Sequence, residues 1–431
     1  MNKICLISPP YGWFKSELDP PFSLMYLAAV AEKAGWQAEI LDMSNLNMTI
    51  PDADIYGVTS SSPQWNETLE LSRRLKQEHP ESLCIVGGNH ISAEPQDAKS
   101  SKFDAVILRE GELPLKMILA DHQKYKDAPS KPLYLQGEPA PIDSIPFPAR
   151  HLVDWKRYKR GIFWRDKKLA SAVGIVTSRG CVHNCVFCGS CVVFGHRTRF
   201  RSIPNVVAEM RQIIETMNYH GFNFYDDTFA LSRKRVIELC AEFKKLNIVW
   251  RCLSRADTVD SELLKVMNES GCKELILGVE SGSQKILNNL RKGTTVQQNL
   301  KAMKLTKEAN IQVKVGIIVG NPGETWESVR ETEELLKKCP PDYWVVSTFT
   351  PLPGSEVWTH PERFDIKILS RDFTKYAMVG SDLKGKVVVE TQAMSKTDIE
   401  QARDELIELL SEISPVGNYL LWDKTQKEGR D

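Results

Sequence analysis

The chain has 431 residues, 42% of them hydrophobic, which is enough to form the cores of two domains. Its 56 basic and 56 acidic residues balance, and no apolar run approaches the length of a membrane span, so neither nucleic acid nor a membrane is expected as a partner. The ten cysteines are mostly scattered, which favours a reducing compartment over a disulfide framework, and we expect a cytoplasmic protein.

The N-terminal third alternates short apolar runs with helical segments. This alternation predicts a doubly wound parallel sheet, flavodoxin-like or Rossmann-like, over residues 1–123, with ligands bound at the carboxyl ends of its strands. The expected strands are 3–8, 38–43, 54–59, 83–86 and 105–108, with a helix over 22–34.

Small and glycine residues follow three of these strands, at 59–62, 87–90 and 110–112. Glycine lets a ligand approach the backbone, and hydroxyl groups can bond a phosphate or an amide. The same residues would also serve as tight turns of a sheet without a ligand, and on their own they leave both interpretations open.

Residues 124–165 are predicted to link this domain to the next one. Six prolines lie between residues 124 and 150, a composition typical of a connection rather than of a helix or a central strand. Proline also limits the slack of a connection, so the two domains are expected to keep a restricted separation.

Cys181, Cys185 and Cys188 form a C-x3-C-x2-C motif within one short loop. Three thiolates at this spacing can ligate three irons of a [4Fe-4S] cluster and leave the fourth iron open to chelate a small molecule. Two alternatives are weaker, because buried free cysteine would not need this spacing and a zinc site needs four ligands, usually in two pairs. Cys191 could be a fourth ligand and make the cluster an electron carrier, but we favour an uninvolved thiol.

Residues 166–350 alternate six further strands with helices, several of which begin at a capping residue such as Ser202, Ser232 or Asp260. This pattern predicts a partial barrel, in which functional groups stand at the carboxyl ends of the strands. The expected strands are 173–177, 222–225, 248–253, 274–279, 313–319 and 343–349. Residues 351–431 are predicted to be an extension that shapes the substrate site, with an amphipathic helix capped at Ser395.

The three clustered cysteines, with Phe187 directly before the last of them, resemble the signature of the radical S-adenosylmethionine (SAM) superfamily. The resemblance implies a partial (β/α)6 barrel in which the open iron binds the amino and carboxylate groups of SAM. Reductive cleavage would then release a 5′-deoxyadenosyl radical, with a low-potential protein such as ferredoxin or flavodoxin as reductant. The residues that the resemblance places against SAM are Phe187, Asp226, Asp227, Ser254, Arg255, Glu280, Ser281 and Gly320.

Four of these residues have an expected role. The carboxylates of Asp226 and Asp227 would accept hydrogen bonds from the ammonium of SAM, the fork of Arg255 would pair with the methionyl carboxylate, and Glu280 would bind the ribose hydroxyls. For each residue the alternative is a helix cap or a surface ion pair, but four polar groups in register at strand ends favour a binding site.

A flavodoxin-like domain placed before such a barrel resembles the cobalamin-binding subgroup of the superfamily. The loop 11–21 contains no histidine and no D-x-H-x-x-G motif, so the resemblance implies cobalamin with its lower base detached and no histidine on cobalt. His90 is the alternative ligand, although a histidine after Gly-Gly-Asn more often completes a loop hydrogen bond. The expected cobalamin contacts are Ser23, Leu24, Thr59, Ser60, Ser61, Gln64, Trp65, Gly87, Gly88, Asn89, Glu110, Gly111 and Glu112.

Together these resemblances predict a C-methyltransferase that moves methyl from methylcobalamin to an unactivated carbon. The compact chain also resembles the enzymes that methylate a glutamine of methyl-coenzyme M reductase, which makes a protein glutamine side chain a candidate substrate, with a small molecule as the other possibility. Two alternatives are a radical rearrangement or cyclisation without methyl transfer, and an iron-sulfur redox or binding protein in which Cys191 is the fourth ligand.

Overall fold

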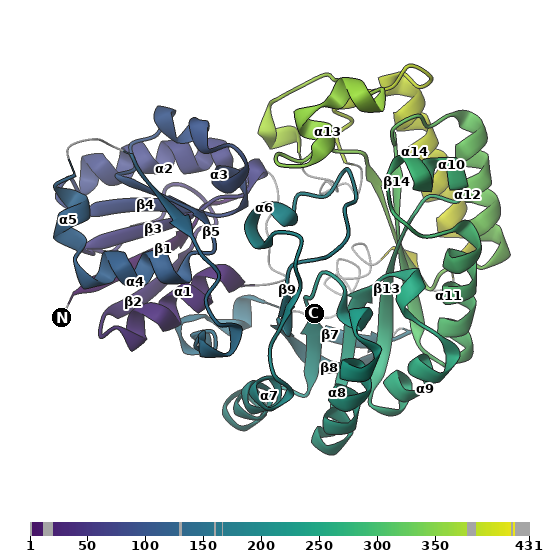
Figure 1. Cartoon of the computed structure of the whole chain (residues 1–431), viewed down its shortest axis with the longest axis horizontal. Helices are drawn as coiled ribbons and strands as arrows, with labels where there is room; N and C mark the ends of the chain where they lie inside the picture. Colours follow the sequence, from purple (N-terminus) through teal and green to yellow (C-terminus); the bar gives the residue numbers. More distant parts are fainter. Residues whose placement is uncertain are drawn as a thin grey trace, which may run out of the picture.

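The computed structural model describes residues 2–11, 20–128, 132–158, 161–165, 167–376 and 385–414, together with the backbone of 417–418. Two α/β units lie side by side in Figure 1, the first in purple and blue and the second in teal to yellow. The short helix α6 (Cys191–Phe194) lies between them. Within the described residues, no helix has the length and apolar composition needed to cross a membrane.

The first unit is a six-stranded sheet with the order β2-β1-β3-β4-β5-β6, in which all paired strands are parallel. The chain moves to one side of β1 for β2 and to the other side for β3, and this reversal leaves a crevice at the carboxyl ends of β1 and β3. The elements are β1 (Lys3–Ser8), α1 (Phe22–Lys33), β2 (Gln37–Asp42), β3 (Ile55–Thr59), α2 (Trp65–Glu78), β4 (Leu83–Gly87), α3 (Asn89–Ala93), β5 (Ala105–Arg109), α4 (Glu112–Ala120), α5 (His122–Lys126) and β6 (Leu133–Gly137).

The segment 124–165 differs from the uninterrupted linker that the prolines predict. Its early part adds β6 to the edge of the first sheet, parallel to β5, and its last part forms β7 (Gly161–Trp164) at the edge of the second. Strand β6 has alternating burial, as expected of an edge strand with one face in solvent, and edge strands tolerate flanking proline. Proline density therefore did not distinguish a connection from an edge strand.

The second unit is a curled sheet whose central six strands, β8 and β11 to β15, are all parallel. Strand β7 runs antiparallel to β8 at one edge, and β18 (Gly417–Asn418) pairs with β15 at the other. The predicted fold class, a doubly wound domain followed by a partial barrel, is confirmed. The elements are β8 (Lys167–Ile175), α7 (Ile203–Met217), β11 (Gly221–Phe224), α8 (Arg233–Leu246), β12 (Val249–Ser254), α9 (Ser261–Glu269), β13 (Cys272–Glu280), α10 (Gln284–Asn289), α11 (Val296–Glu308), β14 (Gln312–Val319), α12 (Trp326–Lys338) and β15 (Tyr343–Thr348).

The helices begin where the sequence places their caps. The side chains of Ser202 and Asp260 accept hydrogen bonds from the backbone of the first turns of α7 and α9, and Ser395 forms a capping box at α14 (Lys396–Ile413). Ser232 occupies the N-cap position of α8 without a side-chain bond. Helix α14 packs against α12, β14 and β15, and its predicted part in shaping a substrate site stays a prediction.

The extension after β15 also contacts the first unit. Trp358, on α13 (Glu356–Thr359), donates from its indole nitrogen to Glu94. Further along, the ring of Phe373 lies 4.7 Å from the ring of His90, which lies 4.6 Å from that of Trp65. The extension therefore holds the two units together on the side where their strands end.

A buried ionic triad joins the segment before β7 to the second unit. The fully buried Glu209, on α7, forms an ion pair with Arg150 through one carboxylate oxygen, at 2.6 Å, and with Arg201 through the other. Arg150 and Arg201 also donate to the backbone carbonyls of Gly174 and Val176, at the end of β8. Since both cations share one carboxylate, loss of that carboxylate leaves two buried charges without compensation.

Substitution Glu209→Gln is expected to lower the free energy of unfolding by about 3 to 5 kcal/mol, because it removes the charge that compensates two buried arginines. Urea or thermal unfolding followed by circular dichroism measures the loss. The matched control is Glu215→Gln on the same helix, where the glutamate is exposed and the change is expected to stay within about 0.5 kcal/mol. Equal stability of the two variants would contradict a role for the triad.

Candidate active site between the two sheets

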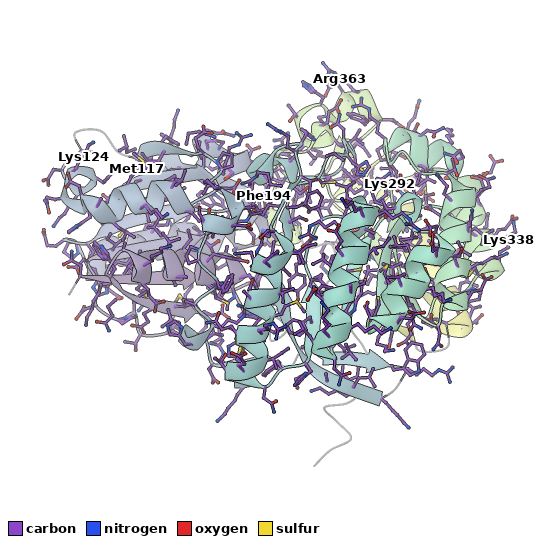
Figure 2. The ribbon with its side chains drawn as sticks, turned by 60° about the horizontal axis from the view of Figure 1, so that its bottom comes forward. Met117, Lys124, Phe194, Lys292, Lys338 and Arg363 are labelled. Carbon is purple, nitrogen blue, oxygen red and sulfur yellow. The ribbon has the colours of Figure 1, made fainter. Side chains whose placement is uncertain are left out.

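A cavity of about 980 Å³ lies between the two units, at the carboxyl ends of the strands of the first sheet. Its wall from the second unit includes Ser178, Arg179, Phe194, Tyr225 and Asp227. Figure 2 labels Phe194 at the junction of the two units. A volume at the upper end of the range for small-molecule pockets suits a large cofactor.

The cavity gathers most of the residues that the sequence predicts against cobalamin. Those that line it are Ser23, Leu24, Thr59, Ser60, Ser61, Gln64, Gly87, Gly88, Asn89, Glu110, Gly111 and Glu112. Trp65 does not line it. The Trp65 side chain is buried beside His90 in the core under the sheet, so the structure corrects this expectation in favour of packing at the start of α2.

The floor of the cavity is built from closely packed backbone. Gly88 has a φ of +113°, and a Cβ there would lie 2.6 Å from the carbonyl oxygen of Ser60, so a side chain would push the two loops apart. Ser60 N–H donates to the carbonyl of Gly87 at 2.8 Å, and the amide of Gln64 donates to the carbonyl of Pro9. These bonds join the loops after β1, β3 and β4 into one surface that a flat ligand can approach closely.

His90 lies under this floor and does not line the cavity. Its Nδ1 is 3.1 Å from the hydroxyl of Ser62 and its Nε2 is 3.1 Å from a carboxylate oxygen of Asp97. Burial lowers the pKa of His90 to about 4, so the ring is neutral at pH 7. Both ring nitrogens are engaged, which agrees with the loop hydrogen bond rather than with cobalt ligation. No histidine is among the described residues that line the cavity, while residues 12–19 of the loop 11–21 lie outside the described part of the chain.

The cysteine loop lies between the two strands of a short antiparallel ribbon, β9 (Ser178–Arg179) and β10 (Arg199–Phe200), and β9 begins just beyond the end of β8. Gly180 has a φ of +86°, and a Cβ there would lie 2.3 Å from the carbonyl oxygen of Arg197, so only glycine fits this turn. Within the loop, the N–H of Cys188 donates a hydrogen bond to the carbonyl of Cys185 at 3.1 Å. The three motif cysteines are free thiols, each partly exposed.

These thiols fit an iron-sulfur cluster by their chemistry, since all three are free cysteines of one loop. Within the described residues, no three His, Cys, Asp or Glu side chains converge closely enough to hold a single metal ion, whereas a cluster binds each thiolate at a different iron. Burial raises the pKa of Cys185, and the nearby charges of Lys292 and Arg255 oppose this rise. Cys191 is a partly exposed thiol on α6 that donates to the carbonyl of Cys188 at 3.9 Å.

Asp226 holds the chain just before the cysteine loop. Its buried carboxylate accepts hydrogen bonds from the backbone of Thr177 at 2.7 Å and from the hydroxyls of Thr177 and Ser178 at 2.5 and 2.7 Å. Burial raises the pKa of Asp226, and these bonds oppose the rise. The neighbouring Asp227 lines the cavity, and burial followed by the charge of Asp226 raises its pKa. Of the predicted pair, Asp227 is therefore the carboxylate that lines the cavity, and its contact with SAM stays a prediction.

Arg255 and Glu280 stand at the ends of β12 and β13, as the sequence predicts, but each already has a partner. Arg255 forms a two-point pair with Asp257, at 3.0 Å from Nε and 2.9 Å from Nη2. Glu280, in a left-handed conformation with φ of +63°, pairs with Lys292 at 2.7 Å. Lys292 was absent from the sequence prediction because nothing in its local pattern places it opposite a strand end.

The other predicted SAM residues contact protein groups. Ser254 accepts from the N–H of Ala230 at 3.1 Å, and Ser281 accepts from the N–H of Ser283 at 3.1 Å. Gly320 donates to the carboxylate of Glu324. Phe187 packs on the barrel core. Their assignment to SAM stays a prediction.

Arg179 connects the cysteine loop to the first sheet. Its guanidinium lies 2.8 Å from Glu110 and 2.7 Å from Glu112, and it lies over the rings of Tyr26 and Phe194. Burial lowers the pKa of Arg179, but Glu112 and Glu110 raise it more, so the charge is retained. Glu110 and Glu112, which the sequence predicts as cobalamin contacts, are thus also the anions that pair with Arg179 between the units. The sequence did not reveal these ion pairs because Arg179 is far from both glutamates in the chain.

The comparisons with known proteins agree with this arrangement. Residues 18–119 match the B12 binding domain family, and residues 175–336 match the Radical SAM superfamily. The fold resembles that of the radical S-adenosylmethionine methyltransferase TsrM from Kitasatospora setae, solved with cobalamin and a [4Fe-4S] cluster, with a TM-score of 0.72 at 16% identity over 96% of this chain and 89% of that one. A solved structure at this identity shows the fold alone.

The two family matches define the class of protein, a radical SAM enzyme with a B12-binding domain, and imply a [4Fe-4S] cluster, SAM and cobalamin as its cofactors. An uncharacterized methyltransferase of Pyrococcus horikoshii, PH0819, is 30% identical over 418 residues, which cover 89% of this chain and 88% of the relative. The chain therefore belongs to the family of B12-binding radical SAM methyltransferases that this relative represents. An anaerobic magnesium-protoporphyrin IX monomethyl ester cyclase of Rubrivivax gelatinosus is 26% identical over 417 residues, covering 89% of this chain and 73% of the relative.

Substitution Arg179→Met is expected to weaken the contact between the units by about 3 kcal/mol or more, because Glu110 and Glu112 are then buried with less compensation. The midpoint temperature of thermal unfolding and the fraction of cobalamin retained after gel filtration are both expected to fall. Arg197→Met is the matched control, an exposed arginine two residues before β10. If the two variants retained cobalamin and unfolded alike, Arg179 would not connect the units in the way described.

Proposed function

We propose that this protein is a cobalamin-dependent C-methyltransferase that acts on an unactivated carbon by a radical mechanism. The observation that carries the proposal is that strand ends of both units line one cavity, with Ser60 and Gly88 on one side and Asp227 on the other. Two cofactors at the edges of one cavity can act on one substrate without its release between steps.

When bound, the cluster with SAM supplies a hydrogen-abstracting radical and cobalamin supplies the methyl group. The chain positions these groups and shields them. The loops after β3 and β4 offer a close-packed backbone surface to the corrin, and Asp227 offers an acceptor to the ammonium of SAM. The absence of histidine from the described cavity lining supports cobalamin with its lower base detached and no histidine ligand.

Reconstitution under anaerobic conditions with iron, sulfide and hydroxocobalamin is expected to give protein that retains cobalamin. After reduction with SAM, mass spectrometry is expected to find 5′-deoxyadenosine, and S-adenosylhomocysteine once a substrate is methylated. The electronic spectrum of the retained cobalamin reports whether its base is detached. SAM cleavage without cobalamin retention would contradict methyl transfer by this route.

Cys191 provides a matched control for the cluster. Cys185→Ala is expected to lose the cluster, because the groups around a cluster cannot replace one of its thiolate ligands. The iron and sulfide content and the formation of 5′-deoxyadenosine are expected to fall by more than about tenfold. Cys191→Ala is expected to keep both near the wild-type level. A Cys191→Ala variant without a normal cluster would instead favour an electron carrier with four thiolate ligands.

The proposed substrate class includes a protein glutamine side chain, such as that of methyl-coenzyme M reductase. The support is the resemblance of the sequence to the enzymes that methylate this glutamine. Incubation of the reconstituted enzyme with a peptide bearing the glutamine tests this substrate, and a gain of one methyl on the glutamine carbon chain is the expected result. An unmodified peptide alongside a methylated small molecule would exclude it.

A second candidate is radical cyclisation without methyl transfer, which the similarity to the Rubrivivax gelatinosus cyclase favours. The products separate the two functions. Methylated product together with S-adenosylhomocysteine supports the methyltransferase, whereas 5′-deoxyadenosine with a cyclised, unmethylated product supports the alternative.

A further inference from the structure

The wall of the cavity contains a cation that the proposed function has not yet used. Arg109, the last residue of β5, lines the cavity and is exposed. Within the described part of the chain, its guanidinium takes part in no ion pair. By contrast, Arg179 in the same wall is paired with Glu110 and Glu112. The charge of Arg109 is therefore open to a ligand that enters the cavity.

The backbone of Arg109 is held in an uncommon conformation. Its φ is +66°, in the left-handed region that residues other than glycine seldom adopt. The hydroxyl of Ser92 accepts a hydrogen bond from the N–H of Arg109 at 2.9 Å and donates one to the carbonyl of Gly88 at 2.7 Å. These bonds tie the end of β5 to the loop that forms the floor of the cavity. Such backbone conformations are concentrated at active sites and at segments that hold ligands.

The guanidinium of Arg109 lies beside the second unit. Its Nη2 is 4.0 Å from the position that a Cβ on Gly195 would take, directly after α6. Helix α6 packs against the end of β5 and begins three residues after the motif cysteine Cys188. Arg109 is thus on the side of the cavity where the first unit meets the chain that follows the cysteine loop.

The wall beside this cation is apolar. Val193 and Phe194, the two residues before Gly195, both line the cavity, and Figure 2 labels Phe194 at the junction of the units. Tyr225, at the end of β11, also lines it and is 41% exposed. Large apolar side chains that stay exposed in a cavity, with a few polar groups among them, are typical of a ligand site. A ligand with an apolar body and an anionic group fits this wall.

Lys156 is a further cation of the cavity wall, but it lies elsewhere. It also has no ion pair among the described residues. Its neighbour Arg157 lies 3.8 Å from Asp42, at the end of β2, whereas Arg109 ends β5, and three strands of the sheet separate β2 from β5. Arg109 is therefore the cation on the side of α6 and the cysteine loop.

From these observations we infer that Arg109 binds an oxyanion of the substrate, a carboxylate or a phosphate, which the substrate carries beside an apolar body. The inference rests on the proposed function, because it takes the cavity as the place where the substrate meets both cofactors. The fork of a guanidinium gives two parallel hydrogen bonds to such a group. A two-point contact fixes the orientation of the substrate, so that the same carbon is presented to both cofactors.

Matched probes test this inference before the natural substrate is known. Naphthoate carries a carboxylate on an apolar ring system, naphthyl phosphate carries a phosphate there, and naphthamide is neutral with nearly the shape of naphthoate. The protein is loaded anaerobically with cluster, cobalamin and SAM, and no reductant is added, so that SAM is not cleaved. In equilibrium dialysis, the better-bound anion is expected to bind about 10- to 100-fold more tightly than naphthamide, the range of a charge-assisted hydrogen bond. Which anion binds better distinguishes a carboxylate from a phosphate.

The variants assign this preference to one side chain. In Arg109→Met the preference for the anion over naphthamide is expected to fall close to one, with the affinity for naphthamide little changed. Arg109→Lys keeps the charge without the fork and is expected to retain part of the preference. Lys156→Met is expected to change it by less than about twofold, because exposed charges on opposite sides of the sheet are largely screened from each other. Arg73→Met, an exposed arginine on α2, is the control and is expected to leave it unchanged.

The outcomes separate this inference from the proposed function. Cobalamin-loaded wild-type protein that binds the three probes equally, or an Arg109→Met variant with the full preference, overturns the inference and leaves the proposed function standing. A lower affinity for cobalamin in Arg109→Met, with the preference for the anion unchanged, assigns Arg109 to the cofactor and also overturns the inference. Wild-type protein that holds a cluster and SAM but does not retain cobalamin overturns both.

Discussion

The arrangement of this protein depends on the contact of Arg179 with Glu110 and Glu112. One end of that contact belongs to the ribbon that carries the cysteine loop, and the other follows the last central strand of the first sheet. Because the three groups are buried, they compensate one another only in one relative position of the two units. These ion pairs thus fix the position at which the strand ends of the two sheets face each other, and the cavity lies between those strand ends.

Each side of the cavity has its own rigid support. On the cysteine side, Asp226 binds the chain just before the motif and Gly180 turns it. On the other side, Gly88 allows two loops to touch. Such support matters for chemistry in which a reactive species must meet its substrate before water, because positioning and exclusion of solvent are the main contributions of the protein. The extension around Trp358 and Phe373 contacts Glu94 and His90 of the first unit and so joins both units.

The fold was predictable from the sequence because parallel strands covered by helices are continuous apolar runs, and eleven such runs, most of them separated by helical patterns, leave few alternatives. The cysteine loop was predictable because its ligands are close together in the chain. Edge strand β6 was missed because prolines around it suggest a connection. Arg179 and Lys292 were missed because their partners lie 69 and 12 residues away, and no local pattern encodes such contacts. Trp65 was misassigned because a residue beside a ligand loop can face the core as readily as the ligand.

The central claim is that cobalamin and the cluster share the cavity between the sheets. Electron paramagnetic resonance of protein that carries both cob(II)alamin and the reduced [4Fe-4S] cluster tests it most directly, because two nearby unpaired spins broaden or split each other's signals. The account predicts a dipolar interaction that is present in the doubly loaded protein and absent when either cofactor is omitted. Two unperturbed signals from fully loaded protein would place the cofactors far apart and contradict a shared cavity.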